Sequence, residues 1–364
     1  MPRSKFIAIL TTAVFLSASA FAGTTYAVGT CLPKLPFFTT ISQAVSSVPS
    51  GSTIEVCPGN YAEQVVITQP LTLKGVSAGG SDAAVVAVPP GGLMQMVPDN
   101  NFPGSMILYQ ILVQSTGPVN ITNLAVDGTT VLPPIFPGFW VAGIFYQDSS
   151  GTVSDVSARY QTNLGNGIGI LATINGEEDQ SVAVQDSVVR GFDHEGIAVL
   201  TVAGVLTAHI KVNTIDGSGT SGGIYFRTAT GTVQGNALSG GNNGLGLVYS
   251  SVTVTDNTIS AIGPSGVGMF VTSGSNTIKS NRIDASGQAG VILFDSAINS
   301  AVQSNTIVNS STAVYGCVTT FPASGFTVTG NTITDAAIGV QMPSSNTFSP
   351  NIFYVTGSEA AACP

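Results

Sequence analysis

Charged residues are scarce in this chain of 364 residues. Asp, Glu, Lys and Arg make up only 8% of it, 10 basic residues face 19 acidic ones, and the formal net charge is −9. A protein that binds nucleic acid through phosphate contacts needs a basic surface. We therefore expect no nucleic-acid partner.

Helical periodicity is almost missing as well, which excludes helical bundles and helical repeats. Short runs of Val, Ile and Thr are broken by Gly, Ser and Asn, and Gly alone accounts for 43 residues. This composition is typical of short strands joined by turns. The sequence therefore predicts an all-β protein.

A short sequence motif recurs nine times in residues 121–334. It begins with a β-branched anchor, continues with two residues that are mostly polar and then usually an Asn, and has an apolar residue two positions after the Asn. Successive anchors lie 21 to 32 residues apart, and a period in this range indicates a solenoid. Coils of short strands can stack about 4.8 Å apart with every strand paired in parallel. The repeat therefore predicts a single-stranded parallel β-helix. The anchors are Ile121, Val153, Val184, Ile210, Val233, Val254, Ile278, Val302 and Val328.

A second strand, led by glycine, follows many of the anchor phrases, and a third strand per coil is inferred. The leading glycines are Gly143, Gly167, Gly196, Gly223, Gly266 and Gly290.

Stacking places equivalent residues of neighbouring coils above one another. Three positions after the anchor, six coils carry Asn, for which we predict a structural ladder of amide hydrogen bonds. Five positions after the anchor every residue is apolar, which predicts a buried column. The ladder is Asn213, Asn236, Asn257, Asn281, Asn305 and Asn331; the column is Val126, Ala158, Val189, Ile215, Leu238, Ile259, Ile283, Ile307 and Ile333.

The N-terminus has the pattern of a signal peptide. Arg3 and Lys5 precede an apolar run over residues 6–21 that ends in Ala-Phe-Ala22. A membrane anchor is the alternative, but the run is short and contains Ser and Thr. We predict removal of residues 1–22, which takes the net charge from −9 to −11. The mature protein is then secreted, periplasmic or extracellular, without a membrane span.

Four cysteines fit an exported protein. Three pairings are open from the sequence. Local pairing of Cys31 with Cys57 and of Cys317 with Cys363 would staple the two ends of the solenoid, where such a fold frays. A bridge between the two ends is excluded by the length of the rod.

The segment at residues 39–75 resembles the N-terminal segment of secreted proteins of the pectate-lyase-like group. Apolar residues at 41, 44, 45 and 48 form a helical stripe, and Gly-Ser-Thr-Ile-Glu-Val-Cys-Pro-Gly-Asn-Tyr61 follows. The resemblance implies a right-handed parallel β-helix with an N-terminal capping helix. The group includes lyases, hydrolases, esterases, epimerases and proteins without known activity, so it does not select a reaction. The Asn-Thr-Asp, Asp-Asp and Gly-His-Gly motifs of polygalacturonases are absent.

We predict one domain over residues 23–364. Residues 23–75 form the N-terminal cap and first coil, 119–345 the regular coils and 346–364 the C-terminal cap. We expect a monomer.

The position after the buried column must point outward, and its residues are the main functional candidates. Four successive coils carry Asp127, Arg159, Arg190 and Asp216 there, whereas the coils after residue 230 offer chiefly Ser, Thr and Asn. Scarce side chains gather near these four. They are Tyr160, Asp193, His194 and Glu195, the single tryptophan Trp140 in the insertion Gly128–Ala142, and Arg227 on the second strand.

Two interpretations of these residues stay open. One is a structural stack of ion pairs, Asp127 with Arg159 and Arg190 with Asp216. The other is a carbohydrate groove along coils 127–227, in which aromatic residues stack on sugar rings and ionisable side chains transfer protons. In that groove Arg159, Arg190, Asp193, His194, Glu195 and Asp216 are catalytic candidates, and Asp127, Trp140, Tyr160 and Arg227 bind the substrate.

The predicted partner is a polysaccharide or cell-wall glycan. As an enzyme the protein would be a lyase, with Arg or His as the base, or a hydrolase with paired carboxylates, Asp193 with Asp216 or Glu195. The alternative is a secreted or cell-surface β-helix without catalysis. No cofactor and no metal site are expected, although the acidic loop Glu177–Glu178–Asp179 offers oxygen ligands of the kind that Ca²⁺ takes.

Overall fold

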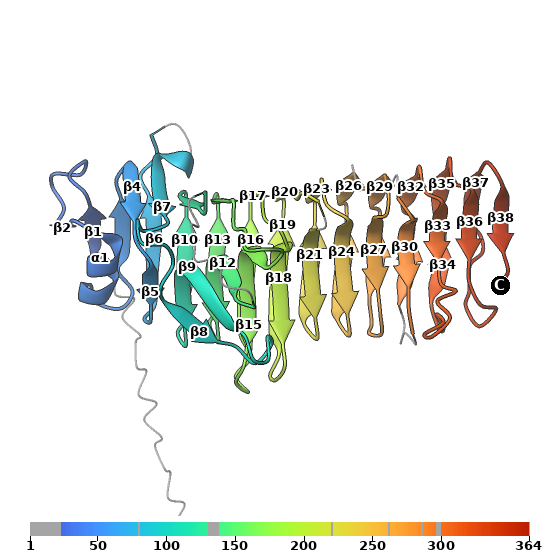
Figure 1. The fold of residues 1–364 in the computed structure, drawn as a ribbon, viewed down its shortest axis with the longest axis horizontal. Helices are drawn as coiled ribbons and strands as arrows, with labels where there is room; N and C mark the ends of the chain where they lie inside the picture. Colours follow the sequence, from blue (N-terminus) through green and yellow to red (C-terminus); the bar gives the residue numbers. More distant parts are fainter. Residues whose placement is uncertain are drawn as a thin grey trace, which may run out of the picture.

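The computed structural model of the protein is a rod of stacked coils (Figure 1). It describes residues 23–78, 81–129, 138–219, 221–260, 263–284, 287–295 and 300–363. The predicted signal peptide, 1–22, lies outside the described residues. Each coil contributes one strand to each of three sheets, here called A, B and C, and every pairing between coils is parallel in the described part except that of β8 with β9.

Sheet A carries the anchor strands. Its strands, in spatial order, are β2 (Phe37–Phe38), β1 (Thr25–Val28), β3 (Thr53–Val56), β6 (Leu71–Gly75), β10 (Val119–Thr122), β13 (Gly151–Ser154), β16 (Gln180–Gln185), β19 (Leu206–Lys211), β22 (Thr230–Gln234), β25 (Ser251–Thr255), β28 (Thr277–Lys279), β31 (Ala301–Gln303) and β34 (Thr327–Thr329).

Sheet B carries the predicted buried column. Its strands are β4 (Gly59–Ala62), β7 (Ala84–Ala87), β11 (Ala125–Asp127), β14 (Ser157–Arg159), β17 (Val188–Arg190), β20 (Thr214–Asp216), β23 (Ala237–Ser239), β26 (Thr258–Ser260), β29 (Arg282–Asp284), β32 (Thr306–Val308), β35 (Thr332–Thr334) and β37 (Ile352–Tyr354).

Sheet C carries the glycine-led strands. Its strands are β5 (Val65–Ile67), β9 (Met106–Gln114), β12 (Trp140–Gln147), β15 (Gly167–Ile174), β18 (Glu195–Thr201), β21 (Gly222–Arg227), β24 (Asn243–Val248), β27 (Val267–Val271), β30 (Ala289–Leu293), β33 (Thr312–Tyr315), β36 (Ile338–Gln341) and β38 (Ser358–Ala361), with β8 (Met96–Pro98) beside β9. The stacking thus continues into the segment assigned to the C-terminal cap.

The predicted register of sheet B is confirmed. Val126 pairs with Ala158, Ala158 with Val189, and Val189 with Ile215, and all four are fully buried. The same column continues to Ile333 with at most 2% of any side chain exposed. Alternation along each strand then points the next position outward.

Glycine leads the sheet C strands because the chain there passes directly over the sheet B column. A Cβ on Gly196 would lie 2.5 Å from the Cγ2 of Ile215, and one on Gly290 would lie 2.4 Å from the Cγ2 of Ile307. In β15 and β27 the glycines that stack in this column are Gly169 and Gly268. The predicted leading glycines of these two strands, Gly167 and Gly266, each lie two residues before the stacked one.

The predicted asparagine ladder is present in the turn between sheets A and B. The Oδ1 of Asn257 accepts hydrogen bonds from the backbone N–H and the Nδ2 of Asn236, both at 2.9 Å. Its Nδ2 donates to the carbonyl of Val233 at 2.9 Å. The pattern repeats from Asn213 to Asn331, and Asn351 adds one more step. These amides are structural.

An Asn257→Ala variant should lose about 3 kcal/mol of unfolding free energy, because the N–H of Asn236 and the carbonyl of Val233 would stay buried without these partners. Thr258 is exposed in the neighbouring position, so Thr258→Ala should change stability by less than about 0.5 kcal/mol. Chemical denaturation of both variants measures the difference, and equal stabilities would contradict the structural role.

The N-terminal end of the rod is covered by the predicted capping helix. Helix α1 (Ile41–Ser47) covers the N-terminal end of the core with Ile41, Ala44 and Val45 (Figure 1). The Glu63 carboxylate accepts the backbone N–H groups of Ile41 and Ser42 at 2.8 Å, which caps the helix.

The predicted disulfides are confirmed, Cys31 with Cys57 and Cys317 with Cys363. No described helix is long and apolar enough to span a membrane.

Candidate functional site

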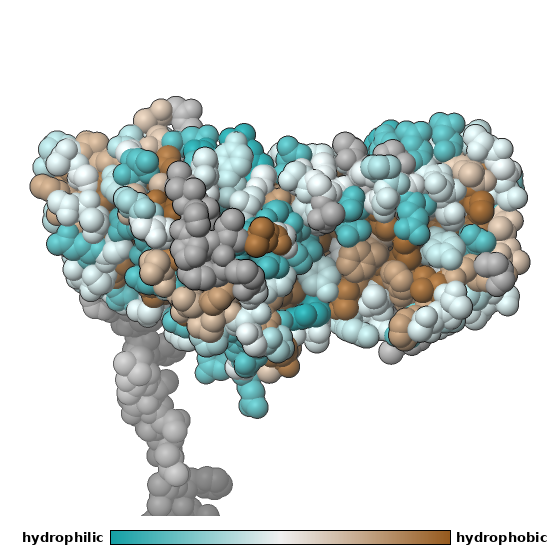
Figure 2. Space-filling view, in the orientation of Figure 1, coloured by the Kyte–Doolittle hydropathy of each residue, from teal (hydrophilic) through white to brown (hydrophobic). Residues whose placement is uncertain are grey.

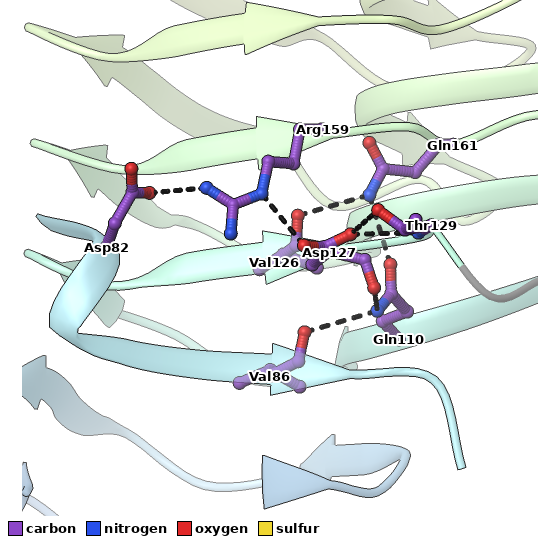
Figure 3. Close-up of polar contacts among 8 residues, drawn as sticks. All are labelled: Asp82, Val86, Gln110, Val126, Asp127, Thr129, Arg159 and Gln161. Atoms are coloured by element: carbon purple, nitrogen blue, oxygen red, sulfur yellow. Dashed lines mark hydrogen bonds and ion pairs between the residues drawn. The ribbon is translucent and has the colours of Figure 1, made fainter. Parts of the chain in front are cut away.

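The outward column of sheet B forms a bonded network around Arg159 (Figure 3). Its Nε donates to Asp127 at 2.9 Å and its Nη1 to Asp82 at 2.7 Å. Desolvation raises the pKa of Asp127, but its hydrogen bonds with Thr129 and Arg159 outweigh this and leave the pKa below the ordinary value. Only 15% of the Arg159 side chain is exposed. These contacts support the structural interpretation of Asp127 and Arg159.

The second predicted ion pair is not formed. Arg190 and Asp216 are neighbours in register and both are exposed. Asp216 instead accepts a hydrogen bond from the Oγ of Ser239 at 3.0 Å, one coil further on. The prediction of an Arg190–Asp216 pair is therefore wrong.

Tyr160 and Asp193 serve the turns that lead from sheet B to sheet C. Tyr160 has a positive φ of 63° and lies against Gly191, whose Cβ, if present, would be 2.7 Å from its ring. The Asp193 carboxylate accepts backbone N–H groups of Asn163, Gly165 and Gly167 at 2.9, 2.9 and 2.5 Å. Its oxygens are thus engaged in holding the previous turn.

The other candidates gather on the outer face of sheet C, around a pocket of about 520 Å³. We call it the sheet C pocket. Ile168, Ala198 and Leu200 supply apolar surface from β15 and β18. The remaining lining residues are Asn101, Phe102, Pro103, Ser105, Trp140, His194, Glu195, Tyr225 and Arg227.

One wall of the pocket comes from a segment that we call the strap, residues 94–105, which includes β8. The buried carboxylate of Asp99 accepts hydrogen bonds from Gln147 on one coil and from Thr173 and Asn175 on the next, at 3.0, 2.6 and 3.0 Å. Arg227 donates from Nη2 to the carbonyl of Asn101 at 2.7 Å. The strap is therefore tied down across sheet C from β12 to β21.

Aromatic rings meet where the strap faces the pocket. The Phe102 and Trp140 rings lie 4.6 Å apart between centroids, and the Trp140 and His194 rings lie 4.6 Å apart edge to face. These contacts fix the orientation of Trp140.

Glu195 is the most perturbed ionisable group at this site. Burial raises the pKa of its carboxyl to about 8, because the charged form loses its hydration there. Its neighbour in register, Gly222, has no side chain, and a Cβ there would lie 2.2 Å from Oε2. Gly222 thus makes the space that Glu195 occupies, and at neutral pH this carboxyl is protonated.

His194 is neutral at pH 7 for the same reason. Burial lowers its pKa, against the opposing charge of Asp193. Its Nδ1 is buried, forms no hydrogen bond with any described residue, and lies 3.7 Å from Oε1 of Glu195. A neutral imidazole can accept a proton.

Tyr225 and Arg227 complete the group from β21. Burial raises the pKa of Tyr225, with the Arg227 charge lowering it and the Glu195 charge raising it. The phenol therefore keeps its proton at neutral pH. Arg227 is the one cation among the lining residues of the pocket at this pH.

The structure divides the predicted groove between two sheets. It brings Trp140, His194, Glu195 and Arg227 together in the sheet C pocket. The other six candidates lie on sheet B or in its turns and line no part of this pocket; they are Asp127, Arg159, Tyr160, Arg190, Asp193 and Asp216. The prediction that all these candidates share one surface is wrong. Tyr160 and Asp193 lie in the turns that follow the sheet B strands, and after each turn the chain enters sheet C, which faces a different way.

Sequence reasoning missed the strap and Tyr225. Phe102 is 38 residues before Trp140 in a segment without the repeat, so no column places it. Tyr225 could have been predicted from the sequence. In the glycine-led strand Gly-Ile-Tyr-Phe-Arg227 inward and outward positions alternate, so Tyr225 points outward on the same side as Arg227.

The chain is a right-handed parallel β-helix, a fold that it shares with solved structures. Mannuronan C-5 epimerase from Azotobacter vinelandii, in its A-module, is 16% identical with a TM-score of 0.60, covering 88% of this chain and 90% of the module. GH136 lacto-N-biosidase from Eubacterium ramulus is 11% identical with a TM-score of 0.68, covering 93% of this chain and 68% of that one. The Dettilon tailspike protein is 14% identical with a TM-score of 0.57, covering 87% and 64%.

A family model described as NosD, periplasmic copper-binding protein, matches residues 180–360. No curated protein matches the sequence. The described residues contain no group of three or more His, Cys, Asp or Glu side chains that could hold a metal ion. In the matched range His194 lies at the sheet C pocket, whereas His209 lies on β19 of sheet A and contacts Thr232. These residues do not fit a copper site.

Proposed function

We propose that the protein binds an acidic polysaccharide in the sheet C pocket and cleaves it by β-elimination at a uronate residue. The carrying observation is the charge of the pocket. Arg227 is cationic, whereas burial keeps Glu195 protonated at neutral pH. In a protein with a net charge of −9, this pocket offers one positive charge and a neutral hydrogen-bond donor to a substrate carboxylate.

The proton transfers follow from the same groups. In the neutral His194 tautomer that carries its hydrogen on Nδ1, the Nε2 lone pair is free to accept a proton. His194 takes the proton α to the carboxylate, the electron pair forms the C4–C5 double bond, and the C4–O glycosidic bond breaks. Tyr225 gives its proton to the leaving oxygen. Arg227 and Glu195 stabilise the charge that develops on the carboxylate.

Trp140 and Phe102 supply the apolar surface that a sugar ring needs. An aromatic face stacks on the C–H face of a pyranose and excludes water from the reacting carbon. The strap holds Phe102 there through Asp99 and Asn101.

Hydrolysis fits the pocket less well. It needs two carboxyl groups on either side of the glycosidic bond. The predicted partner Asp193 is engaged with three backbone N–H groups and Asp216 is on sheet B, so Glu195 is the one carboxyl among the pocket's lining residues.

Similar structures support a saccharide substrate without selecting the reaction. One acts at C-5 of mannuronan and another is a lacto-N-biosidase. The predicted signal peptide and two disulfides support action outside the cytoplasm. A binding protein without catalysis is the second candidate, favoured by the half-buried aromatic residues Trp140, Tyr225 and Phe270 on the outer face of sheet C.

A polysaccharide panel tests the proposal. Pectate, alginate and hyaluronate should yield ultraviolet-absorbing unsaturated ends with at least one member, and neutral glucans should not. Trp140→Ala should weaken binding of the cleaved polymer about tenfold, whereas Arg190→Ala, on sheet B, should leave it unchanged. New reducing ends without absorbance would indicate hydrolysis, and retention without either signal would leave binding alone.

A further inference from the structure

We infer that sheet C holds a second saccharide site, an aromatic track that binds the polysaccharide beyond the pocket. The track consists of Tyr225, Tyr249, Phe270, Phe294, Tyr315 and Phe321. This inference rests on the proposed function, and it gives the substrate as a long chain lying along the rod.

The track surrounds a second pocket, of about 290 Å³, on the coils that follow the sheet C pocket. Tyr249, Phe270, Phe294 and Phe321 line it together with Thr272 and Asp295. Tyr249 and Phe321 are exposed by 61% and 58%. Figure 2 shows hydrophobic residues gathered over β24, β27 and β30 on the same face. The expectation that coils after residue 230 present chiefly Ser, Thr and Asn is therefore wrong for sheet C.

Gly246 makes the track continuous with the sheet C pocket. It lies in register between Tyr225 and Phe270. A Cβ there would lie 2.4 Å from Cζ of Phe270 and 2.7 Å from Cδ2 of Tyr225. The centroids of the Tyr225 and Phe270 rings lie 6.1 Å apart above this glycine. Tyr225 thus belongs to the sheet C pocket and to the track at once.

The lining of the track fits a carbohydrate chain. Beside the four aromatic rings the second pocket has two polar side chains, Asp295 and Thr272. Sugar rings present C–H faces to the former and hydroxyl groups to the latter. From β21 to β33 there are four coil steps, roughly 19 Å. This length accommodates several sugar residues in line with the one held in the sheet C pocket.

Uronate oligosaccharides from disaccharide to octasaccharide, prepared from pectate and alginate, provide the test. Affinity measured by calorimetry should rise with chain length in the wild type. Phe270→Ala and Phe321→Ala should weaken octasaccharide binding about tenfold and leave disaccharide binding unchanged. Tyr354→Ala removes an exposed aromatic side chain on sheet B and should change neither.

The outcomes separate the track from the proposed reaction. Cleavage with an affinity independent of chain length would overturn the track and leave the reaction standing. Length-dependent binding that Phe270→Ala removes, without cleavage, would support the track and overturn the reaction. Dimerisation of the wild type that Phe270→Ala abolishes, measured by sedimentation, would make this face a contact between two copies and overturn the track.

Discussion

His194→Ala should lower kcat by about 100- to 10,000-fold, the range for loss of a general base. The imidazole is neutral because burial lowers its pKa, and it is the group proposed to take the proton α to the uronate carboxylate. KM should change much less than kcat, since Arg227 still binds the substrate carboxylate. Initial rates on the cleaved polymer measure both constants.

His209→Ala is the matched control, because it removes the other histidine from sheet A. It should leave kcat unchanged. A His194→Ala enzyme with wild-type kcat would show that another group takes the proton.

Glu195→Gln should remove most of the pH dependence of substrate binding above neutrality. In the wild type Glu195 loses its proton near pH 8. Its negative charge then offsets the positive charge of Arg227. Affinity for a uronate oligosaccharide should fall as the pH rises through about 8. Gln stays neutral, so the variant should bind more tightly than the wild type at about pH 9 and comparably at about pH 6.

The same group makes protein stability depend on pH. The pKa of Glu195 is raised from 4.5 to about 8 on folding. Between these values the unfolded chain binds fewer protons than the native one, so the unfolding free energy falls as the pH rises. Glu195→Gln should therefore gain on the order of 4 kcal/mol relative to the wild type between about pH 4.5 and 8. Parallel pH profiles of stability would contradict a buried carboxyl.

The repeat made much of the fold predictable. A solenoid places equivalent residues in columns, so the register of sheet B followed from the spacing of the anchors alone. The nine residues of the predicted column, from Val126 in the first of these coils to Ile333 in the last, are buried as expected. The asparagine ladder followed in the same way, because only a stacked amide can bond to the coils above and below. Local pairing of the cysteines followed from the length of the rod.

The site was only half predictable, because columns do not show where the chain turns a corner. Arg190 and Glu195 are five residues apart, yet they belong to β17 of sheet B and β18 of sheet C. The strap carries no repeat, and its position depends on Asp99 bonding to residues 48 to 76 positions away. Such contacts leave no periodic signal in the sequence.

A crystal structure with a bound uronate oligosaccharide would test the central assignment most directly, the placement of the saccharide site on sheet C. We predict a terminal or internal sugar ring between Trp140 and Glu195, its carboxylate at Arg227, and further rings toward Phe270. Sugar density over Arg159 and Arg190 on sheet B, with the sheet C pocket empty, would contradict it.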